Sequence, residues 1–125
     1  MDRLVGVRAE IERVVAAGDT AQALGSGDVP VLGTPRLIAW LEAAAVSALD
    51  GRLPRGATSV GTRIAVDHRA PSAIGDVVRV EAHMVQQEGR AVEFAVRARS
   101  SGGDAIAEGT VSRVIVDRAR FLGRF

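Results

Sequence analysis

Three side chains in this sequence of 125 residues have types suited to acid–base or nucleophilic chemistry, and each stands in a largely apolar segment. Thr34 opens "TPRLIAWLEAAAVSALD", Glu42 is the only charge between Arg36 and Asp50, and His68 ends "TSVGTRIAVDH". Histidine can transfer protons near neutral pH, and a carboxylate can activate water or attack a carbonyl. A hydroxyl near the start of a helix can face a ligand whose developing negative charge the helix favours. Together these groups suit a hydrolytic reaction.

Each of these residues also has a structural explanation, and the sequence leaves both open. Glu42 lies at the edge of an apolar helix stripe, where a carboxylate is commonly solvated. Thr34 precedes a proline and could simply cap the helix. His68 could be a hydrogen-bonded core residue. The other histidine, His83, lies on the polar face of its segment and is expected to be exposed.

The segment from residue 34 to about residue 50 is predicted to form one long helix. Thr34 suits the N-cap, Pro35 suits the first helical position, and Gly51 suits the stop. Apolar side chains recur at helical spacing and predict the buried face: Leu37, Ile38, Leu41, Ala45, Ala48 and Leu49. Between this helix and the preceding strand the chain is rich in glycine and predicts an irregular stretch with one short helical turn.

Alternation of apolar and polar residues predicts β-strands before and after the helix. The first should include Val5, Val7, Ala9 and Ile11, and four more should span about 58–69, 76–88, 90–101 and 104–117. On the strand that ends at His68, the period of two predicts inward-facing Val60, Thr62, Ile64 and Val66, and places Gly61, Arg63, Ala65 and Asp67 on the other face. This order predicts a single α+β domain over residues 1–125, a curved antiparallel sheet wrapped around one helix.

The composition excludes several classes of protein. There is no cysteine and there are two histidines, which argues against disulfides and zinc sites. The formal net charge of +1 argues against a nucleic-acid partner. The longest apolar stretch contains a glutamate and is too short to cross a bilayer, and no signal peptide is evident. We therefore expect a soluble cytoplasmic protein with no metal, cofactor, nucleic-acid or membrane partner.

Three segments, "GTPRLIAWLE", "VGTRIAVDHRAPSAIG" and "EGTVSRVIVDRARF", resemble the hotdog thioesterases of the fluoroacetyl-CoA thioesterase family, over residues of about 30 to 122. The resemblance implies the hotdog fold and hydrolysis of an acyl-CoA thioester by a homodimer. Two such dimers could pack into a dimer of dimers, on which the sequence is silent. It also implies catalytic roles for Thr34, Glu42 and His68 beside the dimer interface. Gly61 and Arg113 would have supporting roles at the substrate. The exposed edge strand that such a sheet leaves independently favours a twofold dimer.

The stretch before the helix, "GSGDVPVLG", contains no aromatic residue. In the fluoroacetyl-specific enzyme of this family, aromatic residues here help to form a lid over the acyl group. The sequence therefore favours another small or medium acyl group. A non-catalytic hotdog module that binds acyl-CoA or an acyl carrier is the alternative. A hotdog hydratase is less favoured, because Asp67 and His68 are adjacent and must point to opposite strand faces.

Overall fold

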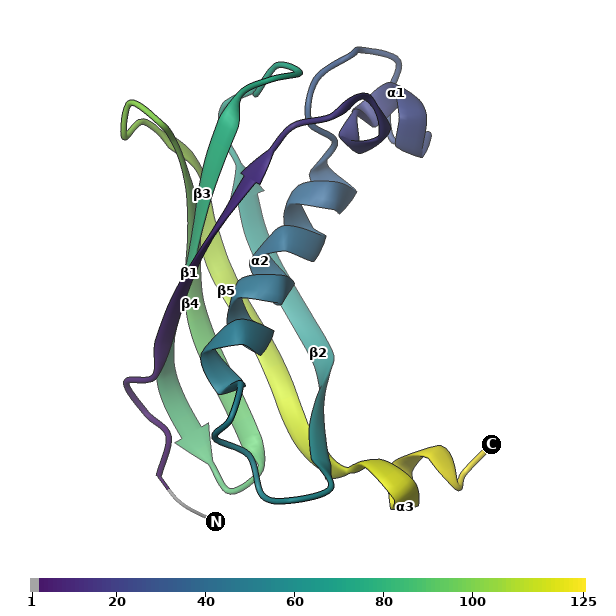
Figure 1. Ribbon diagram of the computed structural model, residues 1–125, viewed down its shortest axis with the longest axis vertical. Helices are drawn as coiled ribbons and strands as arrows, with labels where there is room; N and C mark the ends of the chain where they lie inside the picture. Colours follow the sequence, from purple (N-terminus) through teal and green to yellow (C-terminus); the bar gives the residue numbers. More distant parts are fainter. Residues whose placement is uncertain (1–2) are drawn as a thin grey trace.

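The computed structural model describes residues 3–125 and shows one antiparallel sheet with a long helix along one face (Figure 1). The strands are β1 (Arg8–Val14), β2 (Ala57–His68), β3 (Val77–Glu88), β4 (Ala91–Ser100) and β5 (Ala105–Asp117). The helical segments are η1 (Ala17–Asp19), α1 (Ala21–Leu24), α2 (Thr34–Leu49) and α3 (Arg118–Leu122). The strand order is β1-β3-β4-β5-β2, so β1 and β2 are the two edges.

The predicted α+β architecture and its four later strands are confirmed, with strand ends that differ by at most one residue from those expected. The first strand was predicted too early. Gly6 has a φ of +100° and lies in a turn, which leaves Val5 exposed, so β1 begins at Arg8. The irregular stretch before α2 contains two short helical segments, η1 and α1, where one turn was expected.

Helix α2 packs its apolar face on the sheet and supplies much of the core. Its buried residues are Leu37, Trp40, Leu41, Ala44, Ala45, Ala48 and Leu49. They meet inward-facing strand residues such as Val80, Phe94 and Val111, each fully or almost fully buried. Burial of this apolar surface fixes the position of the helix against the sheet, and thereby the position of any functional group that the helix carries.

The start of α2 differs from the prediction in one respect that matters for function. Gly33 is the N-cap, Thr34 and Pro35 are the first two helical residues, and the Thr34 side chain does not cap the helix. Gly33 packs closely against α1. A Cβ at this position would lie only 3.1 Å from backbone atoms of Ala21. The Thr34 hydroxyl is therefore free to bond elsewhere.

A β-bulge at Thr62 corrects the predicted faces of β2. Gly61 pairs with Arg113 and Arg63 pairs with Ser112, so β2 contains one extra residue between these pairs. The inward series is therefore Ala57, Ser59 and Gly61 before the bulge, and Ile64, Val66 and His68 after it. Val60 and Thr62 were predicted to face inward, and this prediction is wrong. The bulge places Gly61 on the same face as His68.

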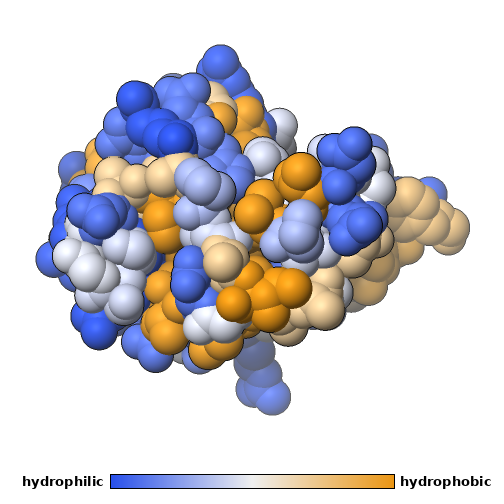
Figure 2. Space-filling model, turned by 90° about the horizontal axis from the view of Figure 1, so that it is seen from above, coloured by the Kyte–Doolittle hydropathy of each residue, from blue (hydrophilic) through white to orange (hydrophobic). Residues whose placement is uncertain are grey.

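Among residues 3–125, no helix is long and apolar enough to cross a membrane. Figure 2 looks onto the end of the molecule that carries α1, and shows apolar residues interspersed with polar ones. The segments that meet at this end carry three large exposed apolar side chains, Val14, Val29 and Ile74.

Candidate active site

The Thr34 hydroxyl and the His68 imidazole form a hydrogen bond between the start of α2 and the end of β2. Thr34 Oγ1 lies 2.8 Å from His68 Nδ1. The side chains meet because α2 begins and β2 ends at the same end of the molecule (Figure 1). The bond fixes the orientation of the imidazole ring, and the tautomer decides which of the two atoms donates.

The other ring nitrogen of His68, Nε2, is buried and has no hydrogen-bond partner within residues 3–125. A buried polar atom without a partner is rare in proteins and often marks a functional site. His68 thus has one nitrogen that bonds to Thr34 and one whose hydrogen-bonding capacity is unused within residues 3–125. This is the arrangement that a general acid or base requires.

A second group of polar residues surrounds the carboxylate of Glu42, in the middle of α2. Arg113 Nη1 donates to Glu42 Oε2 over 3.0 Å, while its Nε donates to Ser59 Oγ over 2.9 Å and its Nη2 to the Ser59 carbonyl over 3.1 Å. The Arg113 side chain is 9% exposed and that of Glu42 is 33% exposed. The guanidinium is therefore fixed by β2 and β5, and it holds the carboxylate where solvent or a ligand can still reach it.

Gly61 provides the space that the Glu42 carboxylate occupies. A Cβ on Gly61 would lie 2.5 Å from Glu42 Oε2 and 3.4 Å from Arg113 Nη1. Any side chain here would displace the carboxylate. A cavity of about 260 Å³ adjoins this group, between the second half of α2 and the start of β2, and its lining includes Val46, Leu53, Ala57 and Ser59.

The five predicted site residues thus lie on one face of the sheet but form two groups. Thr34 and His68 form the first, and Glu42, Gly61 and Arg113 form the second. Since Glu42 follows Thr34 by eight residues, the groups are about 12 Å apart along the helix axis. Within one chain, His68 and Glu42 therefore belong to different groups, and the Glu42 carboxylate bonds to Arg113.

Sequence reasoning missed Ser59, which supplies two of the three acceptors of Arg113. The available signal was its spacing, because Ser59 is two positions before Gly61 and shares its strand face. His83 takes no part in either group. It lines a separate cavity of about 470 Å³ with Arg8, Glu81 and Arg97 among its other lining residues.

Comparison with known proteins identifies the family of this chain. A family model described as fluoroacetyl-CoA-specific thioesterase matches residues 15–119. The chain belongs to this family. The fluoroacetyl-CoA thioesterase of Streptantibioticus cattleyicolor is 34% identical over 91 residues, which is 73% of this chain and 65% of the relative, so the chain matches less than two thirds of that relative's length.

Solved structures show the same fold. The fluoroacetyl-CoA thioesterase structure has a TM-score of 0.88 at 30% identity, covering 96% of this chain and 93% of that one. A thioesterase superfamily member from Thermus thermophilus has a TM-score of 0.92 at 29% identity, covering 100% and 93%. A hot-dog-like protein from Thermanaerovibrio acidaminovorans has a TM-score of 0.86 at 28% identity, covering 96% of this chain and 88% of that one. The predicted hotdog fold is confirmed for this member of the fluoroacetyl-CoA thioesterase family.

Proposed function

We propose that the protein hydrolyses the thioester bond of an acyl-CoA. The observation that carries this proposal is the Thr34–His68 pair, whose buried Nε2 has no partner within the described chain, in a member of a thioesterase family. In the reaction, a water oxygen bonds to the acyl carbon, the carbon–sulfur bond breaks, and the sulfur leaves as the thiol after taking a proton. The products are a carboxylic acid and CoA.

The two polar groups can divide this chemistry between them. His68 Nε2 can deliver or accept the proton that moves between water and sulfur. The backbone N–H groups at the start of α2 have no side-chain cap within the described residues, so they can stabilise the oxyanion that forms on the acyl oxygen. Glu42 can activate the water or attack the acyl carbon itself, and Arg113 fixes the position of its carboxylate.

We further propose that a twofold dimer brings the two groups together across the free edge of β2. If two copies of β2 pair antiparallel with the symmetry axis at residue 65, the extra residue of the bulge lets His68 face Gly61 of the partner subunit. Directly opposite residues in such a pair lie about 5 Å apart and share one face of the sheet. His68 of one chain would then lie beside the partner's Glu42, which supports a site shared between subunits.

The acyl group is proposed to be small or medium in size. The loop that leads into Thr34 carries the exposed Val29 and has no aromatic side chain. An aliphatic lining suits a short acyl chain but offers little to distinguish a fluorine atom from a hydrogen atom. A cytoplasmic location and a single domain over residues 1–125 remain predictions from the sequence.

The direct test is release of free CoA from a panel of short and medium acyl-CoAs. We expect turnover by the wild type and a loss of about 100-fold or more in His68→Ala and Glu42→Ala. His83→Ala is the matched control, because it removes the only other histidine at a distant surface, and it should retain full activity. Acyl-CoA binding without CoA release by the wild type would instead indicate a non-catalytic binding module.

Mixed dimers test the shared site. The His68→Ala and Glu42→Ala chains, carried on two different affinity tags, can be co-expressed and the heterodimer purified. If each site uses His68 from one chain and Glu42 from the other, the heterodimer contains one intact site of two and should show about half of the wild-type activity. A heterodimer as inactive as both parents would place the whole site within one chain.

A further inference from the structure

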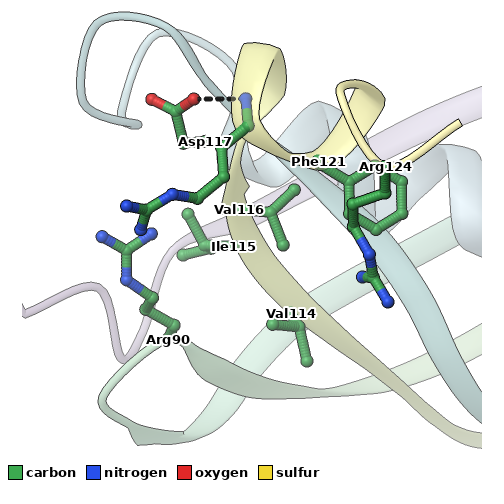
Figure 3. A pocket seen from close by; sticks show the side chains of 8 residues that line it. Arg90, Val114, Ile115, Val116, Asp117, Phe121 and Arg124 are labelled. Carbon is green, nitrogen blue, oxygen red and sulfur yellow. Dashed lines mark hydrogen bonds between the residues drawn. The ribbon is translucent and has the colours of Figure 1, made fainter.

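A second cavity lies at the end of the molecule that carries α3, on the sheet face opposite to Glu42. It has a volume of about 360 Å³ and is lined by Arg90, Val114, Ile115, Val116, Asp117, Arg120, Phe121 and Arg124. Val114 and Val116 alternate along β5 with the buried Arg113 and Ile115, which places them on the outer face. Figure 3 shows Arg90 and Arg124 on either side of these valines.

The three arginines of this cavity carry more positive charge than the one carboxylate of the lining, Asp117, can balance. Arg90, Arg120 and Arg124 form no ion pair within residues 3–125, whereas several exposed arginines elsewhere do. The only acid in the lining is Asp117, whose Oδ1 accepts from the Arg120 backbone N–H over 2.8 Å and so caps α3. Unbalanced guanidinium groups around one cavity favour an anion, above all a phosphate, which arginine can bind in bidentate fashion.

The same cavity also offers an aromatic and apolar surface. Phe121 is half-buried, and the Arg124 guanidinium carbon lies 5.6 Å from the centre of its ring. Val114 and Val116 complete the apolar part of the lining. Aromatic rings and guanidinium planes are the surfaces on which nucleobases stack. The cavity thus combines phosphate-binding charge with a surface for a flat ring.

We propose that this cavity binds a phosphorylated nucleotide, with its phosphates at Arg90, Arg120 and Arg124 and its base against Phe121. The volume is within the range of small-ligand sites, and a nucleotide would use both the charge and the aromatic surface, whereas an inorganic anion would use the charge alone. Two sources share the chemistry: the nucleotide end of CoA, which rests on the proposed thioester hydrolysis, and a free nucleotide. Because the cavity lies on the outer face, away from Glu42, binding of a nucleotide can be measured independently of thioester hydrolysis.

Isothermal titration calorimetry with adenosine 3′,5′-bisphosphate tests the site itself. We expect saturable binding to the wild type and an affinity at least about tenfold lower for the double variant Arg120→Gln/Arg124→Gln. Arg97→Gln is the matched control, because it removes an exposed arginine that bonds to Glu81 outside this cavity, and its affinity should equal that of the wild type. No binding to the wild type, or equal binding to the double variant, would overturn the proposal.

Kinetics then identify the source of the nucleotide. If it is the end of CoA, the double variant should raise the KM for an acyl-CoA about tenfold more than the KM for the matching acyl-pantetheine, which has no nucleotide. If the ratio of the two KM values is unchanged while bisphosphate binding is lost, the cavity binds a free nucleotide. A wild type that binds the bisphosphate but hydrolyses no thioester would refute the proposed function and leave the nucleotide site standing.

Discussion

Replacement of Gly61 by alanine should separate catalysis from stability in this protein. The new Cβ would lie 2.5 Å from Glu42 Oε2, whereas ordinary van der Waals contact begins at about 3.4 Å. The carboxylate must therefore retreat by the difference, about 0.9 Å. A misplacement of about 1 Å in a reacting group can lower a rate about 100-fold, so kcat/KM should fall by about that factor.

The same substitution should affect the free energy of unfolding little. Gly61 does not have a positive φ, and alanine in a strand loses less conformational entropy on folding than glycine does. The nearest atoms belong to the ends of two side chains, of which the closer can swing into a half-exposed space. We expect the free energy of unfolding to change by no more than about 1 kcal/mol.

The assay compares CoA release and urea unfolding for Gly61→Ala, the wild type and Gly18→Ala. Gly18 is the matched control, because a Cβ there has no atom within 4 Å and its φ is not positive. Gly18→Ala should equal the wild type in both measurements. Full activity of Gly61→Ala would refute the argument, since it would mean that the reaction does not depend on where the Glu42 carboxylate lies.

Three further substitutions test other contacts. Thr34→Val keeps the shape of the side chain but loses the 2.8 Å bond to His68, so CoA release should fall about tenfold while the thermal midpoint stays unchanged, and Thr34→Ser should keep the activity. Arg113→Lys loses the planar fork that spans Ser59 and the carboxylate, so urea unfolding should show a loss of about 1–2 kcal/mol, with lower activity. Gly109→Ala puts a Cβ against the backbone of the neighbouring β2, where nothing can yield, so its unfolding free energy should fall by about 3 kcal/mol or more, whereas Gly102→Ala should be neutral.

The elements of the fold were predictable because each has a strong local pattern. The helix stripe from Leu37 to Leu49 and the alternation along β3 and β4 each match one period closely, and burial in the structure follows them. The chemistry of the site residues was visible for a related reason, since Glu42 and His68 are conspicuous polar groups in apolar segments.

What the sequence did not predict depends on contacts between distant residues. Glu42 and Arg113 are 71 positions apart, and no local pattern indicates that they bond. Local preference favours threonine at the N-cap, which is why Thr34 was predicted there. In the structure its hydroxyl instead bonds to His68, 34 positions away. Tertiary structure decided both outcomes.

The bulge in β2 was hidden for a different reason. Val60, Thr62, Ile64 and Val66 are all β-branched and alternate without interruption, so they satisfy the period of two better than the true inward series does. The extra residue changes which face each earlier side chain takes, yet it leaves no mark in the composition of the strand.

The bulge also has a consequence for how this site can vary among related chains. Gly61 and His68 are seven positions apart, and an odd separation on an unbroken strand puts two residues on opposite faces. The extra residue at Thr62 compensates for that odd number. A relative that keeps the geometry without a bulge must therefore have a separation of six between the same glycine and histidine. Deletion of Thr62 would itself produce this separation of six, so it should remove the bulge and still leave Gly61 and His68 on the same face.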